Sequence, residues 1–163
     1  MIKKKEDIMK LLATIPDPEI PVISIVELGV IRDILFIEAK SVEIKMTPTY
    51  SGCPAMKQME DDVRKKLEEN GFENIKITTV FNPPWTTDWL NTEAKQKLRD
   101  YGIAPPEEST TDKSFLTGKH KAVTCPRCKS KNTVMISQFG STACKALYQC
   151  KDCLEAFDYF KCI

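Results

Sequence analysis

Apolar residues recur with a helical period in three parts of the chain. Residues 8–15 carry apolar side chains at i, i+3, i+4 and i+7, and the prolines that follow predict that this first helix ends before residue 16. Residues 54–70 keep the same period over a longer stretch, which Gly71 ends. A third helix is expected to begin at Asn91 or Thr92 and to reach residue 101.

Strand patterns lie between these helices. Residues 30–37 are rich in β-branched and aromatic side chains, and residues 42–46 alternate apolar with charged positions. The two are predicted to pair as a hairpin through residues 38–41, and strand alternation resumes at residues 75–81. The pattern predicts an α+β fold: a small mixed α/β domain with a sheet of three or more strands, packed by helices and followed by a small β-rich ribbon.

Residues 103–120 interrupt the pattern with two adjacent prolines, two glutamates and a serine and threonine run that offers no apolar face. Such a segment is typical of a linker between domains. The expected organisation is therefore an α/β domain at 1–102, a linker at 103–120 and the ribbon at 121–163. His120, the single histidine of the chain, ends the linker and is expected to be a solvated residue.

Composition narrows the expected compartment and partners. No stretch approaches the ~18 apolar residues of a membrane span, and the charged start lacks an apolar leader, so we expect a cytoplasmic protein without membrane contacts. In that compartment the seven cysteines are better explained as metal ligands and reactive thiols than as disulfides. Basic residues outnumber acidic ones in residues 121–163, but no aromatic side chains interleave with them, so nucleic acid is not the expected partner.

Two Cys-x2-Cys pairs give the ribbon a candidate metal site. Cys125 and Cys128 form the first pair, and Cys150 and Cys153 form the second after 21 intervening residues. Because each pair can grip an ion from one side, the spacing predicts a structural zinc ribbon, although iron or an iron–sulfur cluster also suits four sulfurs. A thioredoxin-like redox pair would need only one such motif beside a βαβ unit.

The other two cysteines of this region are Cys144 and Cys162. Either residue can replace or extend the ligand set, and each is equally explained as a small buried apolar side chain.

Cys53 is the candidate functional thiol of the first domain. It lies in the loop 47–54, between a strand end and a helix start, at or next to the position that caps the helix. Free backbone N–H groups and the helix dipole favour a thiolate there, so we expect Cys53 to be the most nucleophilic sulfur. Such a thiolate can hold iron without a catalytic base, whereas a thiol hydrolase needs a base that His120 is poorly placed to supply. The alternative is a cysteine that only packs.

Short motifs along the first domain resemble those of the small iron–sulfur assembly factor domain shared by bacterial SufT-like and eukaryotic cytosolic proteins. The motifs are Asp17-Pro-Glu-Ile-Pro21, Val26-Glu-Leu-Gly29, Met46-Thr-Pro-Thr-Tyr-Ser-Gly-Cys-Pro54 and Phe81-Asn-Pro-Pro-Trp85. Residues 137–147 and 157–162 are similar to the ribbon of the PaaD-type family of phenylacetyl-CoA epoxidase components. The combination of both domains is more specific than either half.

This resemblance implies an accessory protein of aerobic phenylacetate degradation, in which a diiron oxygenase epoxidises phenylacetyl-CoA and an iron–sulfur flavoprotein reductase supplies electrons. It implies that Cys53 transiently holds iron or a cluster while the ribbon holds zinc, and it slightly favours metal contacts for Cys144 and Cys162. The implied partners are the oxygenase and reductase subunits or other iron–sulfur client proteins, with a homodimer as a further assembly.

The chain lacks the parts for the oxygenase or reductase reaction itself. A single histidine excludes the Glu-x-x-His pairs of a diiron centre, and no Gly-x-Gly-x-x-Gly is present for a dinucleotide. We therefore expect no activity from the isolated chain. A structural or regulatory subunit of the oxygenase is the main alternative to a maturation factor, and a nucleic-acid-binding module would show an affinity that falls steeply with salt.

Overall fold

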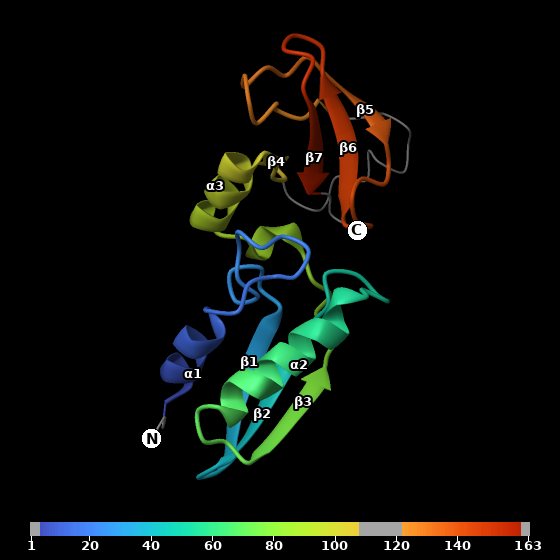
Figure 1. Cartoon of the computed structure of the whole chain (residues 1–163). Helices are drawn as coiled ribbons and strands as arrows, with labels where there is room; N and C mark the ends of the chain where they lie inside the picture. The colour runs from blue at the N-terminus through green and yellow to red at the C-terminus, as the bar shows by residue number, and fades with distance from the viewer. Residues whose placement is uncertain (1–3, 108–121, 161–163) are drawn as a thin grey trace. The chain divides into compact units, whose positions relative to one another are not determined.

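The structure is a computed structural model that describes residues 4–107 and 122–160 of the chain (Figure 1). Its elements, in order, are α1 (Lys5–Leu12), β1 (Ile31–Glu38), β2 (Ser41–Met46), α2 (Ala55–Glu68), β3 (Asn74–Thr79), the 3-10 turn η1 (Thr87–Trp89), α3 (Thr92–Tyr101), β4 (Ile103–Ala104), β5 (Thr133–Ser137), β6 (Lys145–Cys150) and β7 (Ala156–Phe160). The α+β class is confirmed. Of the described helices, not one combines the length and apolar character that crossing a membrane requires.

The contacts within the chain define two units, Met1–Trp85 and Thr86–Ile163. The first unit contains a three-stranded sheet in the order β1-β2-β3. β1 and β2 form the expected antiparallel hairpin, whereas β3 runs parallel to β2, with α2 as the connection that parallel strands need. Figure 1 shows α2 lying across this sheet.

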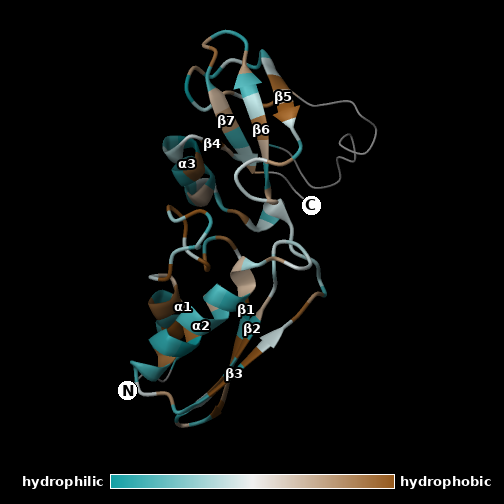
Figure 2. Ribbon diagram, turned by 45° about the vertical axis from the view of Figure 1, so that its right-hand side comes forward, coloured by the Kyte–Doolittle hydropathy of each residue, from teal (hydrophilic) through white to brown (hydrophobic). Residues whose placement is uncertain are grey.

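One face of the sheet and one face of α2 form the core of the first unit. Val42 and Ile44 of β2 are fully buried, and the register sets them beside Ile75 and Ile77 of β3. The apolar stripe of α2 faces them and consists of Met59, Val63 and Leu67, each at most 1% exposed. Burial of each such side chain contributes about 1.5–3 kcal/mol. In Figure 2 brown apolar segments alternate with teal polar ones along α2, as this one-sided packing requires.

The first helix is shorter than its apolar period. α1 ends at Leu12, although Ile15 remains buried and completes the stripe. The chain leaves the helix in a turn, in which the Ile15 N–H donates to the Leu12 carbonyl at 3.0 Å. The residue before a proline is disfavoured in helical conformation, and Pro16 follows Ile15 directly. Pro16 therefore disfavours helical conformation at Ile15, before the proline, as well as in the residues that follow it.

The second unit contains a four-stranded sheet in the order β4-β7-β6-β5. β5, β6 and β7 form an antiparallel meander, and β4 pairs in parallel with β7 through Ile103 opposite Asp158 and Ala104 opposite Tyr159. Residues 103 and 104, expected to begin the linker, therefore belong to a sheet. The division into Met1–Trp85 and Thr86–Ile163 groups α3 and β4 with the ribbon, whereas the expected boundary lies at residue 102. A two-residue strand is too short to produce a periodic sequence pattern.

The core of the second unit is small and rich in sulfur and aromatic rings. Its fully packed members are Ala104, Val123, Cys125, Ala146, Tyr148, Cys150 and Phe157. Tyr148 stacks on Phe157 with ring centroids 6.0 Å apart and meets Tyr159 edge-on at 5.5 Å. A core of this size rarely stabilises a fold without an additional cross-link such as a metal ion.

Candidate metal and thiol sites

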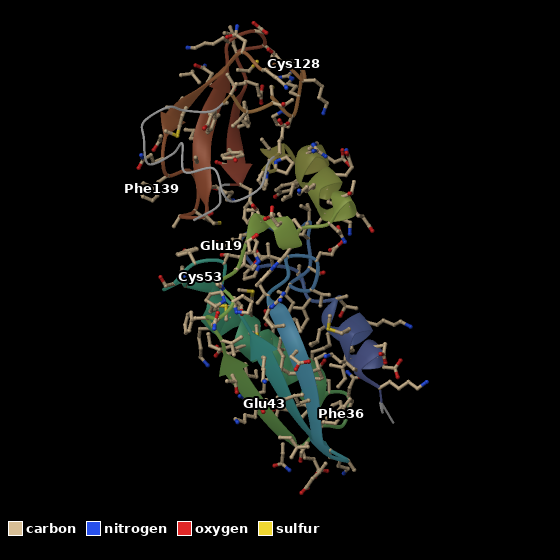
Figure 3. All side chains as sticks on the ribbon, turned by 180° about the vertical axis from the view of Figure 1, so that it is seen from behind. Glu19, Phe36, Glu43, Cys53, Cys128 and Phe139 are labelled. Carbon is tan, nitrogen blue, oxygen red and sulfur yellow. The ribbon has the colours of Figure 1, made fainter. Side chains whose placement is uncertain are left out.

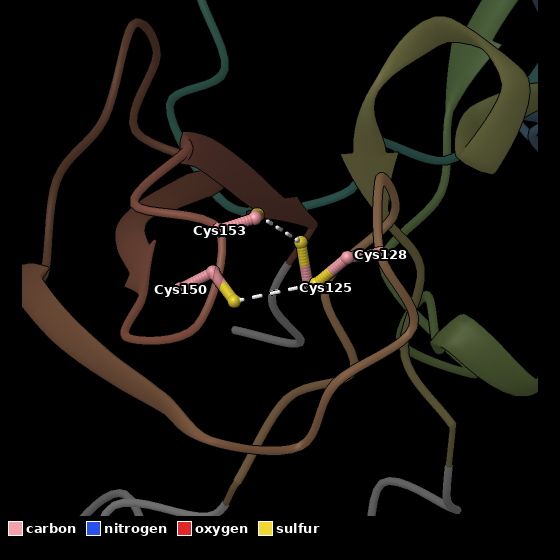
Figure 4. A group of neighbouring side chains, drawn as sticks. All are labelled: Cys125, Cys128, Cys150 and Cys153. Carbon is pink, nitrogen blue, oxygen red and sulfur yellow. Dashed lines mark hydrogen bonds between the residues drawn. The ribbon is translucent and has the colours of Figure 1, made fainter.

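Four cysteines of the second unit point at a common centre (Figure 4). The sulfurs of Cys125, Cys128, Cys150 and Cys153 all lie within 4.8 Å of one another. The distance from Cys125 to Cys153 is 3.7 Å, and that from Cys128 to Cys150 is 3.5 Å. A tetrahedral zinc ion with Zn–S bonds of about 2.3 Å places its sulfurs about 3.8 Å apart. The donor atoms therefore lie close to the arrangement that a single zinc ion needs.

The two cysteine pairs sit in equivalent backbone turns. The Cys125 N–H donates to the Ser130 carbonyl at 2.8 Å, and the Cys150 N–H donates to the Glu155 carbonyl at 2.9 Å. Each bond spans five residues and closes the loop that holds one pair of sulfurs. The ribbon thus presents two similar loops, one from each end of its cysteine pattern, on opposite sides of the centre.

Backbone groups and a nearby cation favour the thiolate form in part of this cluster. The N–H groups of Cys153 and Asp152 help to lower the pKa of Cys150 to about 7. Arg127 pairs with Glu155 and lies close enough to Cys153 and Cys125 to interact with their charges. In contrast, burial and the neighbouring sulfurs raise the pKa of Cys128 to about 12 and also raise that of Cys153. Because zinc binds the thiolate form of cysteine, a bound cation is needed for all four sulfurs to be ionised together.

Cys144, the other cysteine of the ribbon that the structure describes, is not part of the four-sulfur group. Cys144 is 4% exposed, and its sulfur lies 3.0 Å from the Thr142 hydroxyl. Cys162, the second candidate for an additional ligand, lies outside the described residues, as does His120. Among the described cysteines the four-sulfur site therefore excludes Cys144, and a metal contact for Cys162 stays a prediction.

The loop that carries Cys53 is fixed where β2 ends. Thr47 is 1% exposed and bridges two neighbouring segments: its N–H donates to the Val30 carbonyl at 2.9 Å and its hydroxyl to the Val80 carbonyl at 2.8 Å. Further along the loop, the Cys53 N–H donates to the Tyr50 carbonyl at 3.3 Å. Gly52 adopts a left-handed φ of 81°, which lets the chain turn into α2.

Other segments meet the Cys53 loop at the same end of the sheet. The indole N–H of Trp85 donates to the Leu28 carbonyl at 2.8 Å, which ties the chain after β3 to the turn before β1. Asp17 is 4% exposed, and its carboxylate accepts the N–H groups of Glu19 and Ile20. Figure 3 shows Glu19 beside Cys53. All four motif segments of the first domain are therefore brought together.

The expected lowering of the Cys53 pKa is wrong for this structure. Pro54 caps α2, so Cys53 lies one residue before the cap, and it is only 9% exposed. Burial raises the pKa of Cys53, and the charges of Glu19 and Asp17 raise it further. The Ala55 N–H and the Tyr50 side chain act in the opposite direction but are outweighed. Without a bound cation, the thiol is protonated at neutral pH.

Sequence reasoning singled out the loop that begins at Thr47, but it did not identify Asp17 and Glu19 as parts of this site. The motif that contains Asp17 and Glu19 was noted only for its resemblance, and its carboxylates are 34 or more residues from Cys53 along the chain. The available signal was the pairing of two acidic residues with two prolines in a segment that has no helical or strand period. Only the folded chain shows that this segment reaches the thiol.

The chain matches two protein-family models, one for each part. The model of an iron–sulfur cluster assembly protein matches residues 5–78, and the model of the PaaD zinc beta ribbon domain matches residues 109–161. These matches support a soft-metal site in the ribbon and an assembly-factor fold in the first domain.

Individual proteins show the same two-part similarity. A protein of Escherichia coli (strain K12), provisionally named as the D component of 1,2-phenylacetyl-CoA epoxidase, is 47% identical over 96% of this chain and 92% of its own length. An Fe-S protein maturation auxiliary factor of Porphyromonas gingivalis is 37% identical over 60% of this chain and 92% of its own. A crystal structure of a domain of unknown function, DUF59, from Bacillus anthracis superimposes with a TM-score of 0.54 at 33% identity, covering 58% of this chain and 90% of that chain.

Proposed function

The chain belongs to the family of the D component of 1,2-phenylacetyl-CoA epoxidase, and from this membership we propose that it matures iron or iron–sulfur centres of the phenylacetyl-CoA oxygenase and its reductase. Its role is accessory: the isolated chain carries a metal to a client protein and does not itself epoxidise phenylacetyl-CoA. The family of iron–sulfur cluster assembly proteins that matches residues 5–78 supports this assignment.

The observation that carries the proposal is the convergence of four separate segments at the end of the sheet that carries the Cys53 loop. Hydrogen bonds from Thr47 and Trp85 join these segments, and the carboxylates of Asp17 and Glu19 act electrostatically on the Cys53 thiol. A cysteine that only fills space needs no pair of acidic neighbours. A thiol beside two carboxylates is a mixed sulfur and oxygen environment with net negative charge, which attracts a divalent cation.

Iron, the cargo in this proposal, exchanges with the Cys53 proton. As Fe²⁺ approaches, the Cys53 sulfur forms a bond to iron and its proton leaves to solvent, because a coordinating thiol is deprotonated outright. The carboxylates that raise the pKa of the free thiol favour this exchange, since they attract the incoming cation. Transfer to a client reverses the exchange: client ligands take the iron, and Cys53 regains a proton. No electron moves in either direction.

The ribbon is proposed to hold zinc through Cys125, Cys128, Cys150 and Cys153. Four thiolates without an open position are typical of a structural ion, which stabilises the fold and takes no part in the transfer step. In this role the ribbon supplies a rigid surface on which a client docks.

A transfer assay tests the proposed function. The chain is loaded anaerobically with Fe²⁺ and sulfide, separated from free iron, and mixed with metal-free oxygenase or reductase whose activity is then measured. The parent is expected to restore activity, and Cys53→Ala is expected to lose at least tenfold in rate. Cys144→Ala, which removes a buried thiol of the other unit, is the matched control and should behave as the parent. Equal restoration by the parent and Cys53→Ala would refute the maturation role.

One observation favours a second candidate, a non-catalytic structural or regulatory subunit of the oxygenase. The Cys53 thiol is nearly buried and its pKa is raised, as for a cysteine that packs. A structural subunit would co-purify with the oxygenase in fixed stoichiometry, and epoxidation would be unaffected by Cys53→Ala. The transfer assay and this co-purification therefore separate the two functions.

A further inference from the structure

The exposed face of β5 is apolar, against the usual pattern of an antiparallel strand. Val134 is 40% exposed and Ile136 is 54% exposed, while Met135 between them packs on the core of the ribbon. A strand with one face on a core normally turns polar side chains to water. Phe139, just after the strand, is 64% exposed and extends the apolar surface. Figure 2 shows β5 as a brown strand at the side of its sheet.

This apolar stripe, defined as Val134, Ile136 and Phe139, is held in place by local backbone structure. A β-bulge between Met135 and Ser137 interrupts the pairing with β6 at Ile136, and such bulges re-aim side chains. The loop beyond the strand is anchored where the Gly140 N–H donates to the Lys145 carbonyl at 2.7 Å. A Cβ at Gly140 would lie 2.5 Å from one side-chain oxygen of Asp158, whose other oxygen accepts from the Ser141 hydroxyl at 3.0 Å, so a larger residue at position 140 would have to displace this carboxylate. The loop that presents Phe139 is therefore positioned by packing.

β5 is also an edge strand. Among the described strands it pairs with β6 alone, so one side of its backbone faces away from the sheet. An edge strand with apolar side chains is a template for an extended segment of another protein. The bulge at Ile136 limits regular pairing along this edge to a few residues, and in a pair of identical strands both partners would carry the bulge. A short extended segment fits this edge better than a second copy does.

The charge at one end of the stripe indicates the chemistry of the partner. Lys131 and Lys151 are exposed where β5 begins, and the Lys151 N–H donates to the Asn132 carbonyl at 2.8 Å. Of the acidic side chains at this end, Glu155 pairs with Arg127, whereas Asp152 accepts from the neutral Asn132 at 2.8 Å and keeps its negative charge, so the two lysines outnumber the one unpaired carboxylate. The surface is therefore cationic at the start of β5 and aromatic beyond its end.

We propose that the apolar stripe and the adjacent lysines bind an extended segment of a partner protein with apolar residues at alternate positions and acidic residues at its carboxyl end. An antiparallel segment along β5 ends beside Lys131 and Lys151, where acidic side chains are favoured. Apolar side chains at every second position then lie on Val134 and Ile136. This inference rests on the proposed role of the ribbon as the docking surface for a client.

A defined peptide serves as the probe. It alternates valine and threonine over six residues, ends in three glutamates and carries an amino-terminal fluorophore; a second peptide ends in three lysines. Fluorescence anisotropy with the full chain in its zinc-loaded form is expected to show saturable binding of the acidic peptide and at least fivefold weaker binding of the basic one. Equal binding of both peptides would overturn the assignment of the lysines.

Variants of the stripe locate the binding surface. Val134→Glu with Ile136→Glu is expected to weaken binding at least tenfold, because carboxylates replace the apolar contact and repel the acidic end. Val134→Thr with Ile136→Thr keeps β-branched side chains and is expected to weaken binding several-fold, which separates lost apolar contact from added charge. Ile37→Glu, an equally exposed apolar position on β1, is the matched control and should bind as the parent does. Circular dichroism and zinc content confirm that each variant is folded.

Three results would overturn the proposal. The first is unchanged peptide binding by both double variants of the stripe. The second is strong protection from hydrogen exchange, in the free monomer, of a β5 amide that points away from β6, since another part of the chain would then cover the edge. The third is concentration-dependent dimerisation, or binding of a single-stranded RNA probe, that the stripe variants abolish. Iron loading of the first unit, measured on the same proteins, keeps this result apart from the proposed function: a parent that binds peptide but no iron would refute the carrier role alone.

Discussion

Lys129 and Leu154 adopt the same left-handed backbone conformation, with φ of 64° each, one residue after the second cysteine of their pairs. In this conformation a Cβ lies close to the following carbonyl oxygen, which costs a non-glycine residue about 1–2 kcal/mol. The turns of the metal site therefore impose the same strain twice. The gain from closing the four-sulfur site must exceed this cost when the metal is bound.

Relief of that strain at Leu154 should tighten metal binding. Leu154 is 70% exposed, so Leu154→Gly loses little apolar contact and is expected to keep or modestly raise zinc affinity. Leu154→Val places a β-branched side chain at positive φ and should lower zinc affinity at least fivefold. Competition with a chromogenic chelator measures both. A valine variant that binds zinc as tightly as the glycine variant would show that the turn is not strained.

Removal of the metal should unfold the ribbon and spare the first unit. The free energy of structural zinc binding is about 10–16 kcal/mol, which exceeds the stability that the small core of the second unit can supply. After chelation, amides of residues 122–160 are expected to lose protection from hydrogen exchange, while those of α2 and β2 keep theirs. Readdition of zinc should restore the pattern. Protection that persists in β6 and β7 of the metal-free chain would contradict a metal-dependent fold.

The pH dependence of Cys53 follows from its raised pKa. The ordinary thiol value is 9.0, and burial moves the folded value above it. Alkylation of Cys53 by iodoacetamide should therefore be slow at pH 7 and accelerate only above pH 9. The unfolded chain releases this proton at lower pH than the folded chain, so the contribution of Cys53 to stability is present below pH 9 and is lost as pH rises further. Mass spectrometry of the Cys53 peptide gives the alkylation rates. A midpoint of the rate against pH that lies below pH 8 would show that the pKa of Cys53 is lowered and not raised.

Glu19→Gln separates the two effects of the carboxylate near Cys53. Loss of this negative charge should lower the pKa of Cys53 and accelerate its alkylation at pH 8 by about two- to fivefold, the range typical of one partly exposed charge. The same change should weaken iron binding, because the cation loses an attractive partner. The glutamine is nearly isosteric, so the backbone contacts of Asp17 remain. If alkylation and iron affinity rise together, the carboxylate does not assist the cation.

Local patterns in the sequence were sufficient for α2, for the hairpin of β1 and β2, and for the four cysteines of the ribbon. Each depends on spacings of a few residues, which backbone geometry converts directly into a face or a turn. The parallel order of β3 and the pairing of Ile103 and Ala104 with β7 depend on partners far along the chain. No periodic signal encodes such a partner, and these two features were not predicted.

The state of Cys53 shows the same limit in electrostatic terms. The helix start near Cys53 was visible in the sequence, and the dipole alone favours a thiolate. Burial under the surrounding loops and the negative charges of Glu19 and Asp17 were not visible, since they depend on the fold. Desolvation acts on the whole charge of a thiolate, whereas the dipole equals only about half a charge at its end. The stronger effect therefore came from contacts that the sequence did not reveal.

Metal analysis with near-ultraviolet absorption, after anaerobic reconstitution with Fe²⁺, tests most directly whether Cys53 carries iron. The parent, Cys53→Ala and the control Cys144→Ala are purified in parallel and desalted before measurement. We predict one zinc in all three proteins, with iron and its sulfur-to-iron absorption bands in the parent and in Cys144→Ala but absent from Cys53→Ala. One zinc in every protein and no iron in any of them, under any reconstitution, would contradict the account.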